Sequence, residues 1–188
     1  MKKSTIIIIC IVAIFAILGI AIGSSYNGIV TEQEKVKGAL SNLDVMLQRR
    51  ADLIPNLVST VKGYASHETE AIEKVTSARE RMTQANTVSE KVNANNELAS
   101  SLRSLMVVVE NYPDLKASAN FIQVSDELAG TENRIAVARK DYNDAVQKFN
   151  TSIKKFPKSI IAGMFGFKEE QYFEANPANL EVPNVNFE

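Results

Sequence analysis

Cysteine and histidine are almost absent from this chain of 188 residues, which contains one of each, Cys10 and His67. Zinc sites and iron–sulfur clusters need several such ligands and a disulfide needs two cysteines, so none of these can form within one chain. The eight glycines are scattered and build no phosphate-binding loop. These shortages predict a protein without a metal or another cofactor.

The single histidine also limits catalysis. His67 is followed by Glu68, a fragment of a zinc-protease motif whose second histidine is missing. Any Ser/His/Asp or Cys/His machinery would need His67, and Cys10 lies far away in an apolar run. We interpret His67 as a polar turn residue in front of a helix and predict that the protein is not an enzyme.

An excess of charge of either sign is lacking too. The 21 Lys and Arg nearly balance the 22 Asp and Glu, whereas binding to a phosphate backbone needs a basic surface. Nucleic acid is therefore not an expected partner.

One long hydrophobic run is present, residues 6–22, seventeen residues without a charge. As a helix it extends for about 26 Å, the short end of what crosses a bilayer core. The alternative is a cleaved signal peptide, with Ala21-Ile22-Gly23 as the small-x-small site, but such apolar regions are usually shorter. We therefore expect residues 1–25 to be a retained transmembrane anchor, whose partner is the lipid bilayer.

The flanks of this run suggest an orientation and a self-contact. Lys2 and Lys3 favour a cytoplasmic N-terminus with the following domain outside, in a single-pass signal-anchor arrangement. Gly19 and Gly23 are four residues apart, so two such helices could approach closely and form a homo-oligomer. The simpler explanation is that glycine is common in spanning helices.

Residues 26–157 are expected to form a long-helix bundle domain. Apolar residues recur in heptad columns over 26–64 and again over 121–156, as in a coiled coil, and no stretch alternates like a strand. Turns at 63–66 and 112–114 divide the domain into three helices of matched length, about 55–65 Å each. The sequence predicts an all-α, membrane-anchored, up-and-down antiparallel bundle, with a possible local break within the polar stretch 83–96.

Residues 158–188 follow Pro157, which ends the third helix. We expect a short helix near 160–163 and then an extended tail that packs on the bundle as part of a fourth layer. In an up-down-up bundle the end of the third helix is distal to the bilayer, so its lysines are expected to be solvated. The apolar tail residues are Phe165, Phe167, Tyr172, Phe173, Val185 and Phe187, and the lysines are Lys148, Lys154, Lys155 and Lys158.

Arg50 falls on a core column of the first helix, where an unpaired charge would be costly. With the first and third helices parallel, Arg50 lies level with Tyr142, whose neighbours are candidate partners. The residues of this candidate polar layer are Arg50, Arg134, Arg139, Asn143 and Asp144, with Asp141, Glu132 and Asn133 beside them. We interpret the layer as fixing the register of the bundle. The alternative is an anion or ligand site.

Several of these stretches resemble the LemA family. The most specific is Arg49–Val58, RRADLIPNLV, and Leu40 stands where many members have Trp. Other matching residues are Tyr26, Asn27, Asp44, Val45, Leu47, 61–64, 67–68, 112–117, 120–121, 131–135, 138–139, 142–146, Asn150, Phe156 and Pro157. The resemblance implies a bacterial, membrane-anchored, all-helical protein without an established enzymatic activity. It also implies a role in membrane organisation, because some relatives are linked to magnetosome membranes.

Two functions remain open at this point. The first is a non-enzymatic interaction or scaffold protein that recruits an unknown protein partner. The second is a sensory or small-ligand-binding domain tethered to the membrane. A binding domain should show an enclosed pocket walled by Arg50 or Arg134, whereas a scaffold should show a filled core and an exposed apolar patch.

Overall fold

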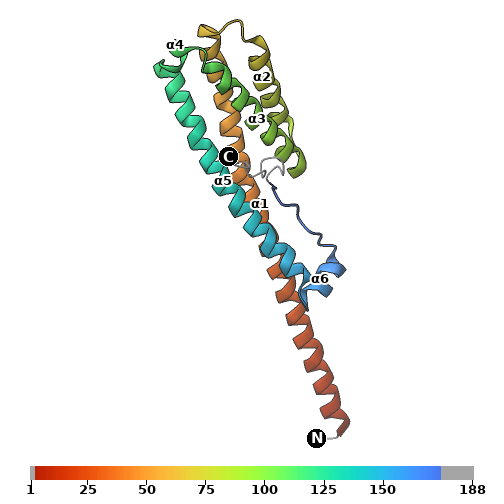
Figure 1. Cartoon of the computed structure of the whole chain (residues 1–188). Coiled ribbons are helices and arrows are strands. Elements are labelled where there is room, and N and C mark those ends of the chain that lie inside the picture. The colour runs from red at the N-terminus through yellow and green to blue at the C-terminus, as the bar shows by residue number, and fades with distance from the viewer. Residues whose placement is uncertain (1–2, 175–188) are drawn as a thin grey trace, which may run out of the picture. The chain divides into compact units, whose positions relative to one another are not determined.

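The computed structural model describes residues 3–174, with side chains from residue 7 onward except residue 10. Every regular element in that range is a helix, which confirms the all-α prediction. The elements are α1 (Lys3–Tyr64), α2 (Thr69–Gln84), α3 (Val88–Val109), α4 (Pro113–Lys116), α5 (Ala119–Lys154) and α6 (Lys158–Phe165) (Figure 1). Their contacts form two compact units, each of which contains part of α1 and part of α5. The predicted domain boundaries at residues 25 and 157 stay predictions.

The long helix α1 continues through Pro55 because another helix replaces the missing hydrogen bond. Proline has no backbone N–H, so Pro55 leaves the carbonyl of Ala51, one turn earlier, without its usual donor. Arg79 of α2 donates from Nε to that carbonyl at 3.0 Å. Because Ala51 is fully buried, an unsatisfied carbonyl there would be costly, and the arginine removes that penalty.

The first part of α1 is apolar and unpacked. Its large hydrophobic side chains from Ile7 to Ile22 are 40–73% exposed. Among the described helices, α1 is the one whose length and apolar composition would allow it to cross a membrane. The most apolar window of α1 has a mean hydropathy of 3.0 and contains no buried residue. A core helix of a soluble protein would be mostly buried, so this segment differs from one.

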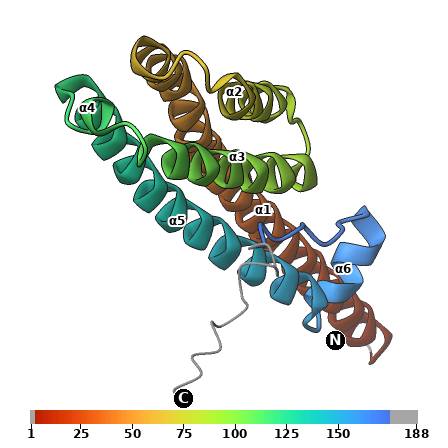
Figure 2. The same cartoon turned by 45° about the horizontal axis from the view of Figure 1, so that its top comes forward.

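The second helical segment is divided into a hairpin. α2 ends at Gln84, and α3 begins at Val88 after its N-cap Thr87, whose hydroxyl accepts a hydrogen bond from the N–H of Glu90. The Glu90 carboxylate in turn accepts from the N–H of Thr87, so the pair forms a capping box. Figures 1 and 2 show α2 and α3 side by side and antiparallel, and Arg81 donates to Glu97 across the pair at 2.6 Å. The up-and-down helical bundle is confirmed. The possible break within residues 83–96 is a complete reversal of the chain direction between α2 and α3.

This extra reversal changes the direction of α5. Within unit 2, Arg50 pairs with Glu132, and Tyr112, just before α4, donates to Glu68, just after α1, so the start of α5 lies near the end of α1. α5 therefore runs antiparallel to α1, and the expectation of parallel first and third helices is wrong. The physical reason is the break at Ala85–Thr87, which adds one crossing of the bundle.

Unit 2 comprises Ser41–Tyr142 and Gln171–Glu188 and contains the filled core of the four-helix region. The predicted columns are buried there as expected, with Tyr64 exposed at the end of α1. Burial of one large aliphatic side chain contributes about 1.5–3 kcal/mol, so this core dominates the stability of the unit. Its fully buried side chains include Leu43, Leu47, Ile54, Leu57, Leu98, Leu105, Ile135 and Tyr142.

Unit 1 comprises Met1–Leu40 and Asn143–Glu170. Here α6 lies against α1: the rings of Tyr26 and Phe165 are 4.7 Å apart, and Lys158 Nζ donates to Glu32 Oε1 at 3.3 Å. Glu32 is ten residues beyond Ile22, a distance of about 15 Å along the helix. The expectation that this lysine-rich end is distal to the apolar run is therefore wrong, because α5 returns along α1.

The residues after α6 continue along the helices in extended form. Asn150 of α5 donates from Nδ2 to the carbonyl of Glu170 at 2.9 Å and accepts from its N–H at the same distance. Phe173 is buried, while Phe165 and Tyr172 are 55% and 40% exposed, so the apolar residues of this segment differ in their environments. Val185 and Phe187 lie outside the described residues.

The contact between Arg79 and Ala51 can be tested with a double-mutant cycle. Arg79→Ala should lower the free energy of unfolding by about 1–2 kcal/mol, because it leaves the buried carbonyl unsatisfied. In a Pro55→Ala background the restored N–H bonds that carbonyl, so the same change should have a smaller effect, with a coupling of about 1 kcal/mol. Urea unfolding of the detergent-solubilised chain measures this, and equal losses in both backgrounds would contradict it.

Candidate functional site

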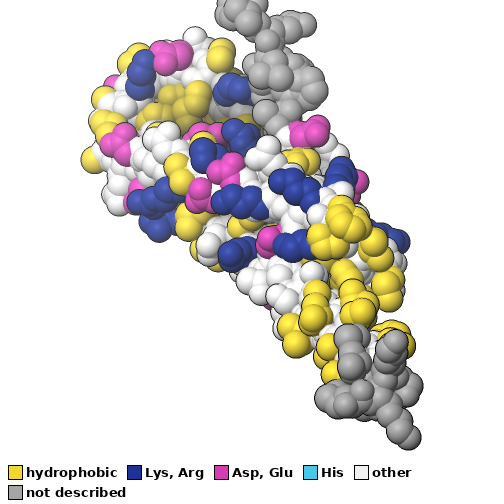
Figure 3. Space-filling view, turned by 90° about the horizontal axis from the view of Figure 1, so that it is seen from below, with side chains coloured by type: hydrophobic (Ala, Val, Ile, Leu, Met, Phe, Trp, Pro, Cys, Tyr) yellow, Lys and Arg dark blue, Asp and Glu magenta, His cyan; other side chains and the backbone are white. Residues whose placement is uncertain are grey.

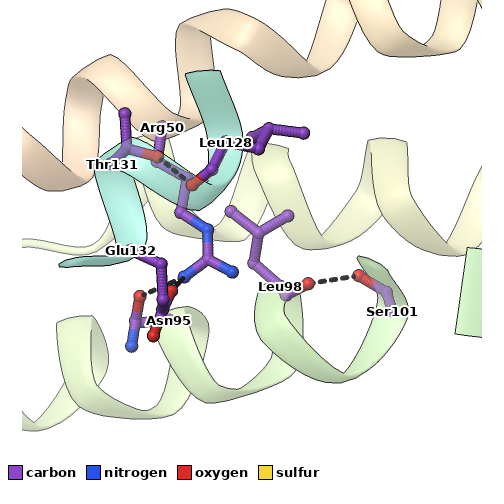
Figure 4. Close-up of polar contacts among 7 residues, drawn as sticks. All are labelled: Arg50, Asn95, Leu98, Ser101, Leu128, Thr131 and Glu132. Atoms are coloured by element: carbon purple, nitrogen blue, oxygen red, sulfur yellow. Dashed lines mark hydrogen bonds and ion pairs between the residues drawn. The ribbon is translucent and has the colours of Figure 1, made fainter. Parts of the chain in front are cut away.

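Arg50 places a charge inside the core of unit 2. Its position on the heptad column turns the side chain inward, and the residue is 6% exposed. Its guanidinium forms an ion pair from Nη1 with Glu132 of α5, and the same nitrogen lies 3.4 Å from Asn95 Oδ1 of α3. Figure 4 shows the three side chains converging from three helices. The cluster thus connects α1, α3 and α5 at one level of the bundle.

The electrostatics of the cluster are asymmetric. The Glu132 side chain is 55% exposed, so its carboxylate keeps much of its contact with water. Burial lowers the pKa of Arg50, and the adjacent Glu132 carboxylate opposes this effect. A guanidinium has so high an intrinsic pKa that Arg50 stays charged. Its Nε has no hydrogen-bond partner among the described residues, so one carboxylate carries most of the compensation.

The other polar groups at this level are satisfied within their own helices. Thr131 is fully buried, and its hydroxyl donates to the carbonyl of Leu128 at 2.7 Å. Ser101 donates to the carbonyl of Leu98 at 3.0 Å (Figure 4). These groups can tolerate burial without a ligand, as expected for a structural polar layer.

The remaining predicted layer residues lie elsewhere. Arg134 is exposed and Arg139 half-buried on α5, and neither is a partner of Arg50. Asn143 and Asp144 belong to unit 1 and make contacts of their own. Of the five predicted residues, Arg50 lies in the cluster, and its ion-pair partner from α5 is Glu132.

Sequence reasoning did not pair Arg50 with Asn95 or Glu132. In the sequence, Glu132 stands out only as a neighbour of Arg134, and Asn95 only as part of a polar stretch with poor helix propensity. The signal that could have found them is the capping-box pattern Thr87-x-x-Glu90, which marks the start of a new helix and reverses the direction of α5.

A surface hollow of about 580 Å³ lies in unit 2 beside this cluster but does not include it. Its lining contains Arg49, Asp52 and Met82, together with Asp44 and Lys91, which form an ion pair at 2.7 Å. Arg50 and Arg134 are absent from that lining. The hollow is open to solvent, so it differs from the enclosed arginine-walled pocket expected of a ligand-binding domain.

His67 and Glu68 lie in the turn before α2, and the contact that Glu68 makes is a structural one. His67 is exposed in the turn before α2, and Glu68 accepts a hydrogen bond from the hydroxyl of Tyr112 at 2.8 Å. This bond raises the pKa of Tyr112. Within residues 3–174, no three His, Cys, Asp or Glu side chains gather in a group that could hold a metal ion.

Comparison with known proteins identifies relatives over most of the chain. A family profile described as "LemA family" matches residues 39–187. The chain is 31% identical over 179 residues to Magnetosome protein MamQ 2 of Paramagnetospirillum magneticum, covering 81% of this chain and 66% of that protein, just under two thirds of its length. It is 25% identical over 151 residues to Protein LemA of Metamycoplasma hominis, covering 80% and 69%. These matches confirm the family resemblance seen in the sequence.

If Arg50 fixes the register of the bundle, replacing Arg50 and replacing its partner Glu132 should have different effects on the free energy of unfolding. Arg50→Met should leave the free energy of unfolding unchanged or raise it by about 1 kcal/mol, because a hydrophobic side chain needs no desolvated counter-charge. Glu132→Ala should lower it by about 2 kcal/mol, less than for a fully buried pair because Glu132 is half exposed.

Urea unfolding measures both changes, with Glu127→Ala as the control, since that exposed glutamate accepts a hydrogen bond from Gln123 on its own helix and forms no ion pair within residues 3–174. The control should change the free energy by less than about 0.5 kcal/mol. A large loss from Arg50→Met, or none from Glu132→Ala, would contradict this interpretation of the cluster.

Proposed function

Because the chain belongs to the LemA family, we propose that it is a non-enzymatic, single-pass membrane protein whose helical bundle acts as a scaffold in membrane organisation. The observation that carries this proposal is the continuity of α1. One helix contains the exposed apolar segment and then the core columns of the bundle. A bundle attached in this way is held at the bilayer by its own longest helix.

Two features of the bundle support a scaffold over catalysis. Its buried Thr131 and Ser101 are satisfied within their own helices, and Arg50 is already compensated by Glu132. The core of unit 2 is filled by large apolar side chains, and several others remain exposed on helical surfaces, among them Val107 at 70% and Val137 at 60%. Exposed aliphatic side chains on rigid helices suit contact with a protein partner.

The similarity to Magnetosome protein MamQ 2 supports the membrane-organisation part of the proposal. The matched region covers just under two thirds of that relative, so we extend the proposed role in membrane organisation only to the region that the two proteins share. We further propose a cytoplasmic N-terminus with the bundle outside the cell membrane, and association of two copies through Gly19 and Gly23. An added Cβ at either glycine would meet no atom within 4 Å, so this small-residue face is open.

A second candidate function is the binding of a small ligand, and the hollow in unit 2 is the observation that favours it. Its volume lies in the range of natural ligand sites, and it combines Arg49, Asp44 and Lys91 with the apolar Met82. The scaffold is preferred because the hollow is open and its Asp44 and Lys91 charges already pair with each other.

Photo-crosslinking in cells tests the scaffold. A photo-reactive amino acid is placed at Val107 or Val137 of the full-length chain, with the fully buried Leu105 as the matched control. The exposed positions should give adducts of higher mass, and Leu105 should give none. The Gly19→Leu and Gly23→Leu variants then separate self-association from capture of a partner. Recovery of monomer alone from both exposed positions would count against a scaffold.

A further inference from the structure

An apolar surface remains exposed where α5 ends and α6 begins. Phe149 is fully buried, but Phe156, one heptad later in the same column, is 82% exposed. Ile160, Met164 and Phe165 of α6 are 54%, 68% and 55% exposed. Figure 3 shows hydrophobic side chains gathered toward the N-terminal end of α1, with lysine and arginine side chains beside them. Exposure of four large side chains so close together in sequence needs an explanation.

The position of this surface within unit 1 identifies its surroundings. Tyr26 is four residues past Ile22, about 6 Å along the α1 axis, and its ring lies 4.7 Å from Phe165 and 5.8 Å from Phe167. The headgroup layer on each side of a bilayer is about 5–7 Å thick. If residues 6–22 span the hydrocarbon, the end of α6 lies at headgroup depth, where aromatic side chains are favoured.

The charge of unit 1 complements an anionic surface. Past the apolar run, its residues include seven Lys against five Asp and Glu, whereas the rest of the chain outside unit 1 has twelve Lys and Arg against seventeen Asp and Glu. Next to α6, Lys154 pairs with Glu169 and Lys158 with Glu32. Lys155 and Lys168 are exposed and form no ion pair within the described part of the chain. They are therefore available to lipid phosphates.

We propose that the exposed side chains of α6, with Lys168, form a lipid-binding surface whose deepest part, the end of α6, lies in the headgroup layer of an anionic bilayer, with Phe156 and Lys155 at its outer edge. The apolar side chains enter the boundary with the acyl chains, and the lysines stay with the phosphates. So small a surface would bind weakly alone, but α1 holds it at the bilayer and makes its binding intramolecular. The inference rests on the retained anchor of the proposed function.

The test uses the full-length chain in lipid nanodiscs. Met164→Cys in a Cys10→Ala background carries an environment-sensitive fluorophore, and the lipids carry a quencher at headgroup depth. The matched control is Gly38→Cys, which is exposed, has no atom within 4 Å of an added Cβ, and lies sixteen residues past Ile22, about 24 Å along α1. Discs of phosphatidylcholine are compared with discs that also contain phosphatidylglycerol.

In anionic discs we expect a blue shift at position 164 and quenching at least about twofold stronger than at position 38. The double variant Lys155→Gln/Lys168→Gln should reduce this difference toward its value in neutral discs, and so should high salt. Lys148→Gln, which removes an exposed charge of α5 outside this surface, should not. Circular dichroism checks that the variants keep their helix content.

Equal, weak quenching at both positions in anionic discs would overturn the lipid-binding surface and leave the scaffold proposal intact. A signal that is the same in neutral discs would also overturn it, because the surface would then not depend on anionic lipid. A signal that appears only when a disc holds several copies would overturn it too, because contact between copies would then cover α6. An intact mass that shows removal of the first residues would instead remove the anchor on which both proposals rest.

Discussion

The reversal of the chain between α2 and α3 decides the arrangement of everything that follows it. Thr87 and Glu90 satisfy each other's backbone donors, so a new helix can start after a gap of only three residues. The bundle then has four crossings, and α5 runs back along α1. That direction brings Glu132 to Arg50 in unit 2 and Lys158 to Glu32 in unit 1.

Two polar contacts between helices of unit 2 each compensate a defect in the core. Arg79 supplies the donor that Pro55 lacks, and Glu132 supplies the charge that Arg50 needs. Both contacts join helices that are distant in sequence, so they favour one register among many that interchangeable apolar heptads would allow. The most specific stretch of the family resemblance, residues 49–58, contains both Arg50 and Pro55.

Periodicity was sufficient to predict the helices and most of the core from sequence. Columns such as Leu47, Ile54 and Val61 are buried as their spacing indicates, because one stripe per helix must face the others. Phe156 continues the pattern of Phe149 and yet is exposed, since α5 ends at Lys154 and the helix face no longer exists there. The periodicity of apolar residues does not predict the residue at which a helix ends and its packing against a neighbouring helix stops.

The partners of Arg50 could not be predicted for a different reason. A heptad column indicates which residues face inward, but the level at which two helices meet depends on how many times the chain reverses. One unrecognised reversal at Ala85–Thr87 turned a parallel pair into an antiparallel one and exchanged Asn143 and Asp144 for Glu132. Helix caps, which are local and weak signals in sequence, therefore determined the layout of the site.

The antiparallel course of α5 along α1 is the central claim, and a thiol-crosslinking assay tests it directly. In a Cys10→Ala background, the pair Glu32→Cys and Lys158→Cys should be joined within one chain by a short bismaleimide, since Lys158 begins α6 four residues after α5 ends and its native side chain forms an ion pair with Glu32. The pair Glu32→Cys and Ile122→Cys should not, because Ile122 lies near the start of α5. A crosslink in the second pair but not in the first would mean that α5 runs parallel to α1, and the account would be wrong.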